Sequence, residues 1–244
     1  MPSFVVAIDG PAASGKGTLA KTLAKHFSFD ALDTGLIYRA VARGLLDAGI
    51  DPSDPALATA AAQNLSLDQL KRPDLRGETV GQAASICSSV PGVRAALLDF
   101  QVRFASKDRP NSGAILDGRD IGTAVCPNAQ VKLWITASPE VRASRRFAEA
   151  SAAGDFSQTV ENIAASIAER DHRERTRPVS PLIPAQDALI IDTTHLSVGE
   201  VFEQAKAQIE MALLSHRSSL SARPAASTDG NLPLAGRVST FRPR

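Results

Sequence analysis

Short apolar runs alternate along this chain with longer stretches in which apolar residues recur at helical spacing. The runs are rich in β-branched residues and fall at 4–8, 114–117, 131–135 and 188–191, with a shorter one ending near Leu32. Continuous apolar runs of this length are typical of strands that are buried on both faces of a parallel sheet. The pattern therefore predicts an α/β fold in three layers, in which a parallel sheet is flanked by helices and joined by right-handed crossovers.

Helices are predicted where apolar residues repeat every three or four positions. Ser138 and Glu140 supply an N-cap and a first-turn acid for the helix that begins at Pro139. Residues 64–78 show little periodicity, and we expect a loop or a short irregular piece there. The predicted helices cover 18–27, 33–45, 55–63, 79–88, 93–104, 139–153, 157–175 and 197–214.

The helical pattern stops after Leu214. The segment 215–244 is rich in Ser, Pro, Gly and Arg, which predicts a disordered basic tail outside a folded body of residues 1–214. We expect deletion of this tail to leave the activity of the body intact.

Composition narrows the class of protein. The hydrophobic fraction of 43% is ordinary for a globular protein, and no apolar run approaches the length of a membrane span. Because the first strand is predicted directly after the N-terminus, we expect no signal peptide, and Cys87 and Cys126 lack metal-binding spacing. We therefore expect a cytoplasmic protein that binds no membrane. The net charge of +1 includes five arginines after His216 against one acid, so the body has no excess of basic residues and we expect no nucleic-acid binding.

Residues 10–18, which read GPAASGKGT, carry the clearest chemical signal in the chain. They lie between an apolar strand and a helix, and they fit the spacing G-x-x-x-x-G-K. Glycines let successive backbone N–H groups turn toward one anion, the helix N-terminus adds free donors, and Lys16 can reach the β- and γ-phosphates of a nucleotide. The segment therefore predicts a phosphate loop.

One position of this loop departs from the general pattern. Gly17 stands where Ser or Thr usually holds magnesium, and Thr18 follows it. The variant GKGT is more similar to that of nucleoside monophosphate kinases than to that of GTPases or motor ATPases.

Two polar clusters near predicted strand and helix ends offer a second binding site. Thr34 and Arg39 lie at a helix N-terminus, where they could hold a phosphate monoester or form a capped helix with a solvated arginine. Asp117 ends a buried strand and could orient magnesium waters opposite the phosphate loop. Gly118 lets the chain turn so that Arg119 points into the cleft, and a salt-bridged turn is the alternative.

A third cluster occupies 169–177. Its residues Arg170, Arg173, Glu174 and Arg177 are spaced to share one helix face. Like charges on one face repel unless Glu174 or an anion neutralises them. Mobile arginines stabilise the charge of phosphoryl transfer by factors of about 10³–10⁵, whereas the alternative is a solvated charged face with internal pairs.

Together these motifs resemble the bacterial cytidylate kinase family. GPAASGKGT, LDTGLIYR, AAS followed by PGVR, LDGRDIGT and ERDHRERTRPVSPL occur in the family's order, and the resemblance covers residues 3 to about 214. It implies a P-loop kinase fold with an acceptor-binding region at about 35–110 and a lid region at about 145–178. It also implies transfer of the γ-phosphoryl of ATP to CMP or dCMP with Mg²⁺. The expected partners are these small-molecule nucleotides, and we expect a monomer because a mobile lid needs free space.

The resemblance further implies site residues, position by position. The residues implied for ATP binding are Gly10, Pro11, Ala12, Ala13, Ser14, Gly15, Lys16, Gly17, Thr18 and Arg173. Those implied for CMP binding are Thr34, Arg39, Ser85, Arg94, Arg119, Asp120, Arg170, Glu174 and Arg177. Catalytic roles are implied for Lys16, Arg119, Arg170 and Arg177, and magnesium binding, through water, for Asp117 and Thr18.

Two features depart from the family's pattern. Glu174 stands where relatives usually have Asp, and its extra methylene changes the expected ribose contact. The stretch 64–78 is shorter than its counterpart in many relatives, where a small sheet domain lies over the acceptor. Deoxyribose preference and base selectivity are therefore open at this stage.

Other functions are weighed against this one. Within enzymes, the alternative is a kinase for UMP, AMP or shikimate, although LDGRD differs from the DGFPR of adenylate kinases. From another class, a GTP-dependent switch protein would require N-K-x-D, which the sequence lacks. The run DLRG at 74–77 imitates the D-x-x-G element of such proteins, but it follows no predicted strand.

Overall fold

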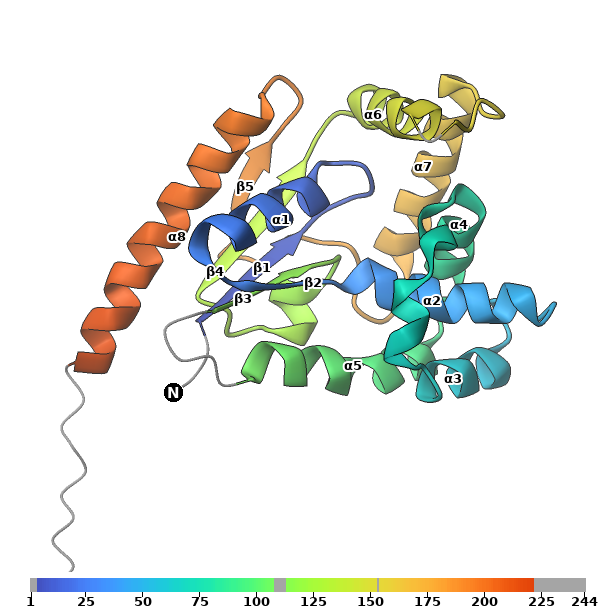
Figure 1. Ribbon diagram of the computed structural model, residues 1–244, viewed down its shortest axis with the longest axis horizontal. Helices are drawn as coiled ribbons and strands as arrows, with labels where there is room; N and C mark the ends of the chain where they lie inside the picture. Colours follow the sequence, from blue (N-terminus) through green and yellow to red (C-terminus); the bar gives the residue numbers. More distant parts are fainter. Residues whose placement is uncertain (1–3, 108–112, 153, 222–244) are drawn as a thin grey trace, which may run out of the picture.

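The centre of the protein is a parallel sheet, as the apolar runs predicted. The computed structural model describes residues 4–107, 113–152 and 154–221. Its five strands lie in the order β2-β3-β1-β4-β5, and every neighbouring pair is parallel (Figure 1). The strands are Phe4–Asp9 (β1), Asp30–Asp33 (β2), Gly113–Asp117 (β3), Val131–Thr136 (β4) and Leu189–Asp192 (β5). Because β1 lies in the middle, the loop that follows it opens at the centre of the sheet's carboxyl edge.

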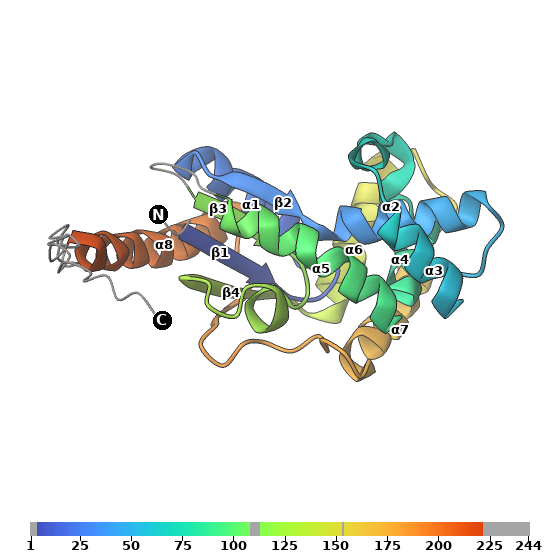
Figure 2. The same cartoon turned by 90° about the horizontal axis from the view of Figure 1, so that it is seen from below.

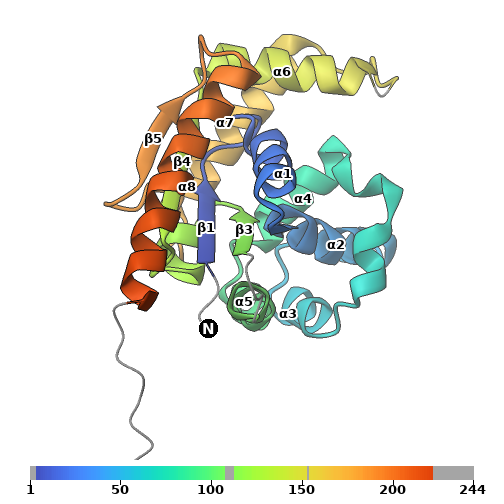
Figure 3. The ribbon, with the colours of Figure 1, turned by 60° about the vertical axis from the view of Figure 1, so that its left-hand side comes forward.

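Helices cover both faces of the sheet, which gives the three predicted layers (Figures 1 and 3). Val6 and Ile8 of β1 pack in a cluster with residues of α1 and α8 on one face. Val5 and Ala7 pack on the other face, in a cluster that includes the end of α5. The alternation follows from the period of two in a strand. The helices are Lys16–Phe27 (α1), Val198–Ser221 (α8) and Pro91–Ser106 (α5).

Two further groups of helices lie beyond the carboxyl edge of the sheet (Figure 2). The first group packs with α5 around its own apolar cluster and falls within the region predicted to bind the acceptor. It contains Thr34–Asp47 (α2), Pro55–Gln63 (α3) and Glu78–Cys87 (α4). The second group overlaps the predicted lid region, starting some residues before it, and packs through Ala143, Ile163 and Ile167. It contains Pro139–Ala152 (α6) and Val160–Thr176 (α7).

The boundary of the tail differs from the sequence prediction. Helix α8 continues past Leu214 to Ser221, so the start of the tail at 215 is wrong, and residues 222–244 lie outside the described structure. The ring of His216 meets that of Phe4 edge-on at 5.5 Å between centroids. This contact places the added part of the helix beside β1, where local composition favoured the end of the helix.

The irregular stretch 64–78 forms two short 3-10 turns, Leu67–Lys71 and Pro73–Arg76. Leu75 of the second turn is buried, and Arg72 pairs with Asp74 within the turns and with Asp47 at the end of α2. Among the described residues, no helix combines the length and the apolar composition that crossing a bilayer requires.

Candidate active site

The loop between β1 and α1 has the backbone geometry of an anion cradle. Gly10 has φ +145°, and a Cβ there would collide with the carbonyl oxygen of Ile135 on the adjacent strand β4. Gly15 has φ +93° at the N-cap of α1. Both positions therefore require glycine for the chain to turn back over the end of the sheet. The loop therefore has the backbone geometry expected of a phosphate loop, and the N-terminus of α1 follows it at the carboxyl edge of the sheet.

Lys16 begins α1 and is only 5% exposed. Its Nζ donates to the carbonyl oxygen of Pro11 at 2.7 Å. Burial, and then the positive charge of Arg119, lower the pKa of Lys16 to about 7, while Asp117 opposes that shift. The ammonium is thus held against the loop in a setting that disfavours its charge, and an anion in the loop would relieve that cost.

Asp117 ends β3 beside this lysine. Burial raises the pKa of its carboxyl to about 6, against the opposing effect of Lys16. A Cβ at Gly17 would lie 3.4 Å from Asp117 Oδ2, so the carboxylate faces the first turn of α1. Thr34 donates its hydroxyl to the carbonyl oxygen of Asp117 at 2.8 Å, which joins the start of α2 to the end of β3.

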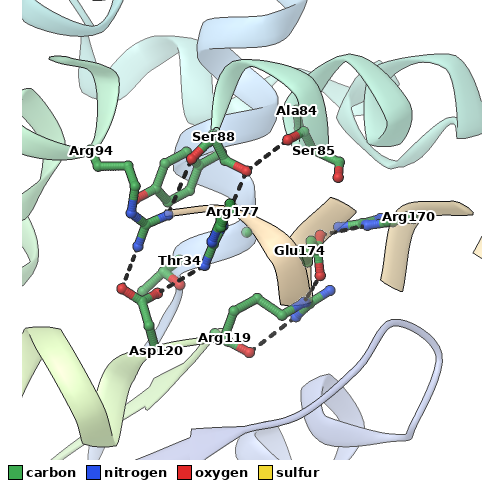
Figure 4. A pocket seen from close by; sticks show the side chains of 13 residues that line it. Thr34, Ala84, Ser85, Ser88, Arg94, Arg119, Asp120, Arg170, Glu174 and Arg177 are labelled. Carbon is green, nitrogen blue, oxygen red and sulfur yellow. Dashed lines mark hydrogen bonds and ion pairs between the residues drawn. The ribbon is translucent and has the colours of Figure 1, made fainter. Parts of the chain in front are cut away.

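A pocket opens next to this edge, between α2, α4, α7 and the turn after β3 (Figure 4). It brings together most of the residues that the sequence proposed for the second substrate. It is lined by Thr34, Gly35, Tyr38, Ala84, Ser85, Ser88, Arg94, Gly118, Arg119, Asp120, Arg170, Glu174 and Arg177. Sequence reasoning missed Tyr38 and Ser88; Tyr38 lies one turn along α2 from Thr34, at the spacing that places two residues on one helix face.

One end of the pocket is organised by Glu174, whose side chain is 3% exposed. Its Oε2 accepts from Arg119 Nε and its Oε1 from Arg170 Nε, each at 2.8 Å. Burial alone would raise the pKa of Glu174, but Arg170 and Arg119 outweigh it and hold this pKa well below its usual range. Glu174 therefore offsets part of the repulsion between two cations that face each other across the pocket, and the cluster keeps a net positive charge.

The other end of the pocket is built around Asp120. Arg94 forms a buried ion pair with its carboxylate and lies over the ring of Tyr38, 5.5 Å from the centroid. Arg177 Nη2 lies 3.9 Å from Asp120 Oδ1, and its Nη1 donates to Ser88 Oγ at 3.3 Å. Three elements that are distant in sequence thus meet at one carboxylate.

Two buried polar atoms in this pocket lack a hydrogen-bond partner: Ser85 Oγ and Arg177 Nη2. Buried polar groups in folded proteins are nearly always paired, because an unpaired one costs about 1–3 kcal/mol. Figure 4 shows Ser85 and Arg177 on the wall of the same cavity. They are the groups that a polar ligand would satisfy.

Two predicted ligands do not point into the pocket. Arg39 Nη1 donates to the carbonyl oxygens of Leu75 and Gly77 at 2.8 and 3.0 Å, and burial followed by the charge of Arg170 lowers the pKa of Arg39 to about 9. Arg173 Nη2 donates to Gln82 Oε1 on α4 at 3.0 Å.

The prediction of one shared helix face at 169–177 is correct only in part. Arg170 and Glu174 share a face, but Arg173 turns toward α4. Arg177 lies just after the end of α7 with extended backbone, because Pro178 follows it.

Comparison with known proteins agrees with this geometry. The family model described as cytidylate kinase matches residues 6–211. The chain is 55% identical over 203 residues to the cytidylate kinase of Paramagnetospirillum magneticum, across 83% of this chain and 96% of that protein. It is 51% identical over 214 residues to the cytidylate kinase of Brucella suis, across 88% of this chain and 96% of the relative. The cytidylate kinase of Nitrobacter winogradskyi is 51% identical over 208 residues, across 85% and 96% of the two chains.

Replacing Glu174 with Gln tests the charge balance of the pocket. The pKa of Glu174 in the folded protein lies below the usual 4.5, so its carboxylate stabilises the fold fully above pH 4.5 and loses that contribution as pH falls further. We expect Glu174→Gln to lower the free energy of unfolding by about 3 kcal/mol at neutral pH. The difference from the unmodified protein should shrink below pH 4.5 in urea denaturation.

Glu149→Gln is the matched control, because Glu149 is an exposed partner of Arg146 and its removal should cost about 0–1 kcal/mol. A Glu174→Gln difference that stays constant through the acid range would contradict the assignment.

Proposed function

We propose that this chain, which belongs to the cytidylate kinase family, transfers the γ-phosphoryl group of ATP to CMP or dCMP and releases ADP and CDP or dCDP. The observation that carries this proposal is the pairing of two sites at one sheet edge. A phosphate loop with a buried lysine adjoins a pocket lined by arginines. In this pocket Ser85 Oγ and Arg177 Nη2 make no hydrogen bond within the protein and could bond to a polar ligand.

The donor is ATP, bound through residues 10–18. The loop N–H groups and the N-terminus of α1 bind the phosphates, and Lys16 reaches them from the base of the loop. An anion in the loop would raise the pKa of Lys16 again, so the lysine would be charged when ATP is bound.

The acceptor phosphate would lie at the end of the pocket held by Glu174. Arg119 and Arg170 already point into it, each fixed by one carboxylate oxygen, and their remaining N–H groups can bind phosphate oxygens. Thr34 lines the same end. Arg39 stays a predicted ligand: it would have to leave the carbonyl oxygens of Leu75 and Gly77 to reach the phosphate.

The base would lie at the other end. Cytosine presents an exocyclic amine and two acceptors, which match a hydroxyl, a guanidinium and a carboxylate. Ser85, Arg94 and Asp120 supply those three groups on adjoining walls. A base without this pattern would leave buried groups unpaired, and that penalty is the source of selectivity.

Magnesium belongs to this proposal as the companion of ATP. The donor set fits, because Asp117 offers carboxylate oxygens beside the first turn of α1, where Gly17 leaves space and Thr18 is exposed. Mg²⁺ keeps most of its waters and uses few protein carboxylates, so Asp117 and Thr18 would hold it through water. When bound, it neutralises charge on the donor phosphates.

The protein's part in the reaction is positioning and charge stabilisation. Lys16 holds the donor phosphates, and Arg119 and Arg170 face the space between donor and acceptor, where negative charge develops. Arg170 lies on α7 of the lid region, so lid closure would bring it to the transferred group and exclude water. Arg177 would fix the acceptor against Asp120. A monomeric state, a cytoplasmic location and the relative use of dCMP stay predictions.

An acceptor panel tests this function. We expect the purified protein with Mg·ATP to phosphorylate CMP and dCMP at least about tenfold more efficiently in kcat/KM than UMP, AMP or shikimate, because only cytosine pairs every buried group. A coupled assay of ADP release measures each rate. Preference for another acceptor would overturn the proposed substrate while leaving a phosphate-loop kinase in place.

Lys16→Ala tests the donor loop. We expect it to lower kcat by about 10²–10³, as the loss of one preorganised donor does. The fold should survive, because the buried site disfavours the lysine's charge and its removal relieves that cost. Lys21→Ala, an exposed lysine on the same helix, should leave kcat unchanged. Near-normal turnover by a folded Lys16→Ala protein would refute the assignment of the loop.

A further inference from the structure

Asp9 is a buried carboxylate that the mechanism above does not use. It is the last residue of β1, directly before the phosphate loop, and it is 5% exposed. Its Oδ1 accepts from the backbone N–H of Ile121 at 2.8 Å, and its Oδ2 accepts from that of Gly122 at 2.7 Å. Each carboxylate oxygen therefore holds one amide of the turn that follows β3.

The turn after β3 is bonded to β1 at two points, and the bonds to Asp9 form the second of them. The N–H of Gly118 donates to the carbonyl oxygen of Ile8 at 2.9 Å, and the amides of Ile121 and Gly122 bind Asp9. Residues 119 and 120 lie between these two points of attachment, which are made by consecutive residues of β1. Both residues line the pocket, so the position of this part of its wall is set by the strand that leads into the phosphate loop.

A carboxylate at this place is not explained by stability alone. Burial raises the pKa of Asp9 to about 7 even though two amides oppose the shift. The nearby charges are Asp120 and Lys16, which have opposite effects on it. The two amide hydrogen bonds offset part of the cost of ionising this buried side chain, and they use both of its oxygens.

We propose that Asp9 is a positioning residue that aligns Arg119 and Asp120 with the phosphate loop. The side chain of Arg119 then meets Glu174, and that of Asp120 meets Arg94. An asparagine could accept only one of the two amides and would set its own NH₂ against the other. The turn would then move, and with it the groups that bind the acceptor, while the phosphate loop itself keeps its glycines and Lys16. The identity of the acceptor as CMP depends on the proposed function.

Asp9→Asn tests this role by separating the two substrates. We expect the Kd for CMP, measured by calorimetry, to rise about tenfold to a hundredfold, with the preference for CMP over UMP reduced, because one buried amide loses its acceptor. The Kd for ATP should stay within about twofold. Asp51→Asn is the matched control: Asp51 accepts from the N–H of Ser53 at 2.8 Å on an exposed turn, and both affinities should be unchanged.

Equal losses of CMP and ATP affinity, or no loss of either, would overturn the proposal. If Asp9→Asn does not fold, amide hydrogen exchange of the unmodified protein decides instead. CMP should slow exchange at Ile121 and Gly122 by about tenfold or more, whereas ATP should leave it nearly unchanged; exchange indifferent to CMP would refute the role. If the unmodified protein does not phosphorylate CMP at all, the proposed function is wrong. That result is distinct from the outcomes above, which concern only the role of Asp9.

Discussion

The site depends on keeping several cations close together before any anion arrives. Glu174 accepts from Arg119 and Arg170 with separate oxygens, and Asp117 faces Lys16 across the edge of the sheet. Each carboxylate lowers the repulsion that would push these groups into solvent. The side chains are consequently fixed while their free N–H groups still face the pocket. Such preorganisation is what phosphoryl transfer requires, because its charge must be stabilised without rearrangement.

The parallel sheet makes this crowding possible. Strands β1 and β3 are neighbours, with Ile8 opposite Asp117, so the loops that follow them leave the same edge side by side. The first is the glycine-rich loop that ends at Lys16, and the second is the turn that carries Arg119 and Asp120. Asp9 joins them through the amides of Ile121 and Gly122. The proposed donor and acceptor positions are therefore tied to one strand end, while Arg170 reaches the pocket from α7.

Local sequence patterns predicted those features that depend on neighbouring residues in the chain. The five strands and the phosphate loop were predicted from the apolar runs and the glycine spacing, as was Asp117 at the end of a strand. The directions of Arg39 and Arg173 could not be predicted, because each is set by partners distant in sequence: two carbonyl oxygens after α3, and Gln82 on α4. Asp9 was missed because its partners lie more than a hundred positions away. The part of α8 beyond Leu214 likewise has a contact that is distant in sequence, between His216 and Phe4.

A crystal structure of the protein with CMP would test the central claim most directly, since the claim is that this pocket receives the acceptor. The account predicts that Ser85 Oγ and Arg177 Nη2, neither of which makes a hydrogen bond within the protein, each lie within about 3.2 Å of a nucleotide oxygen or nitrogen. It also predicts the phosphate between Arg119 and Arg170. A nucleotide bound elsewhere, or one that leaves both buried atoms unpaired, would contradict it.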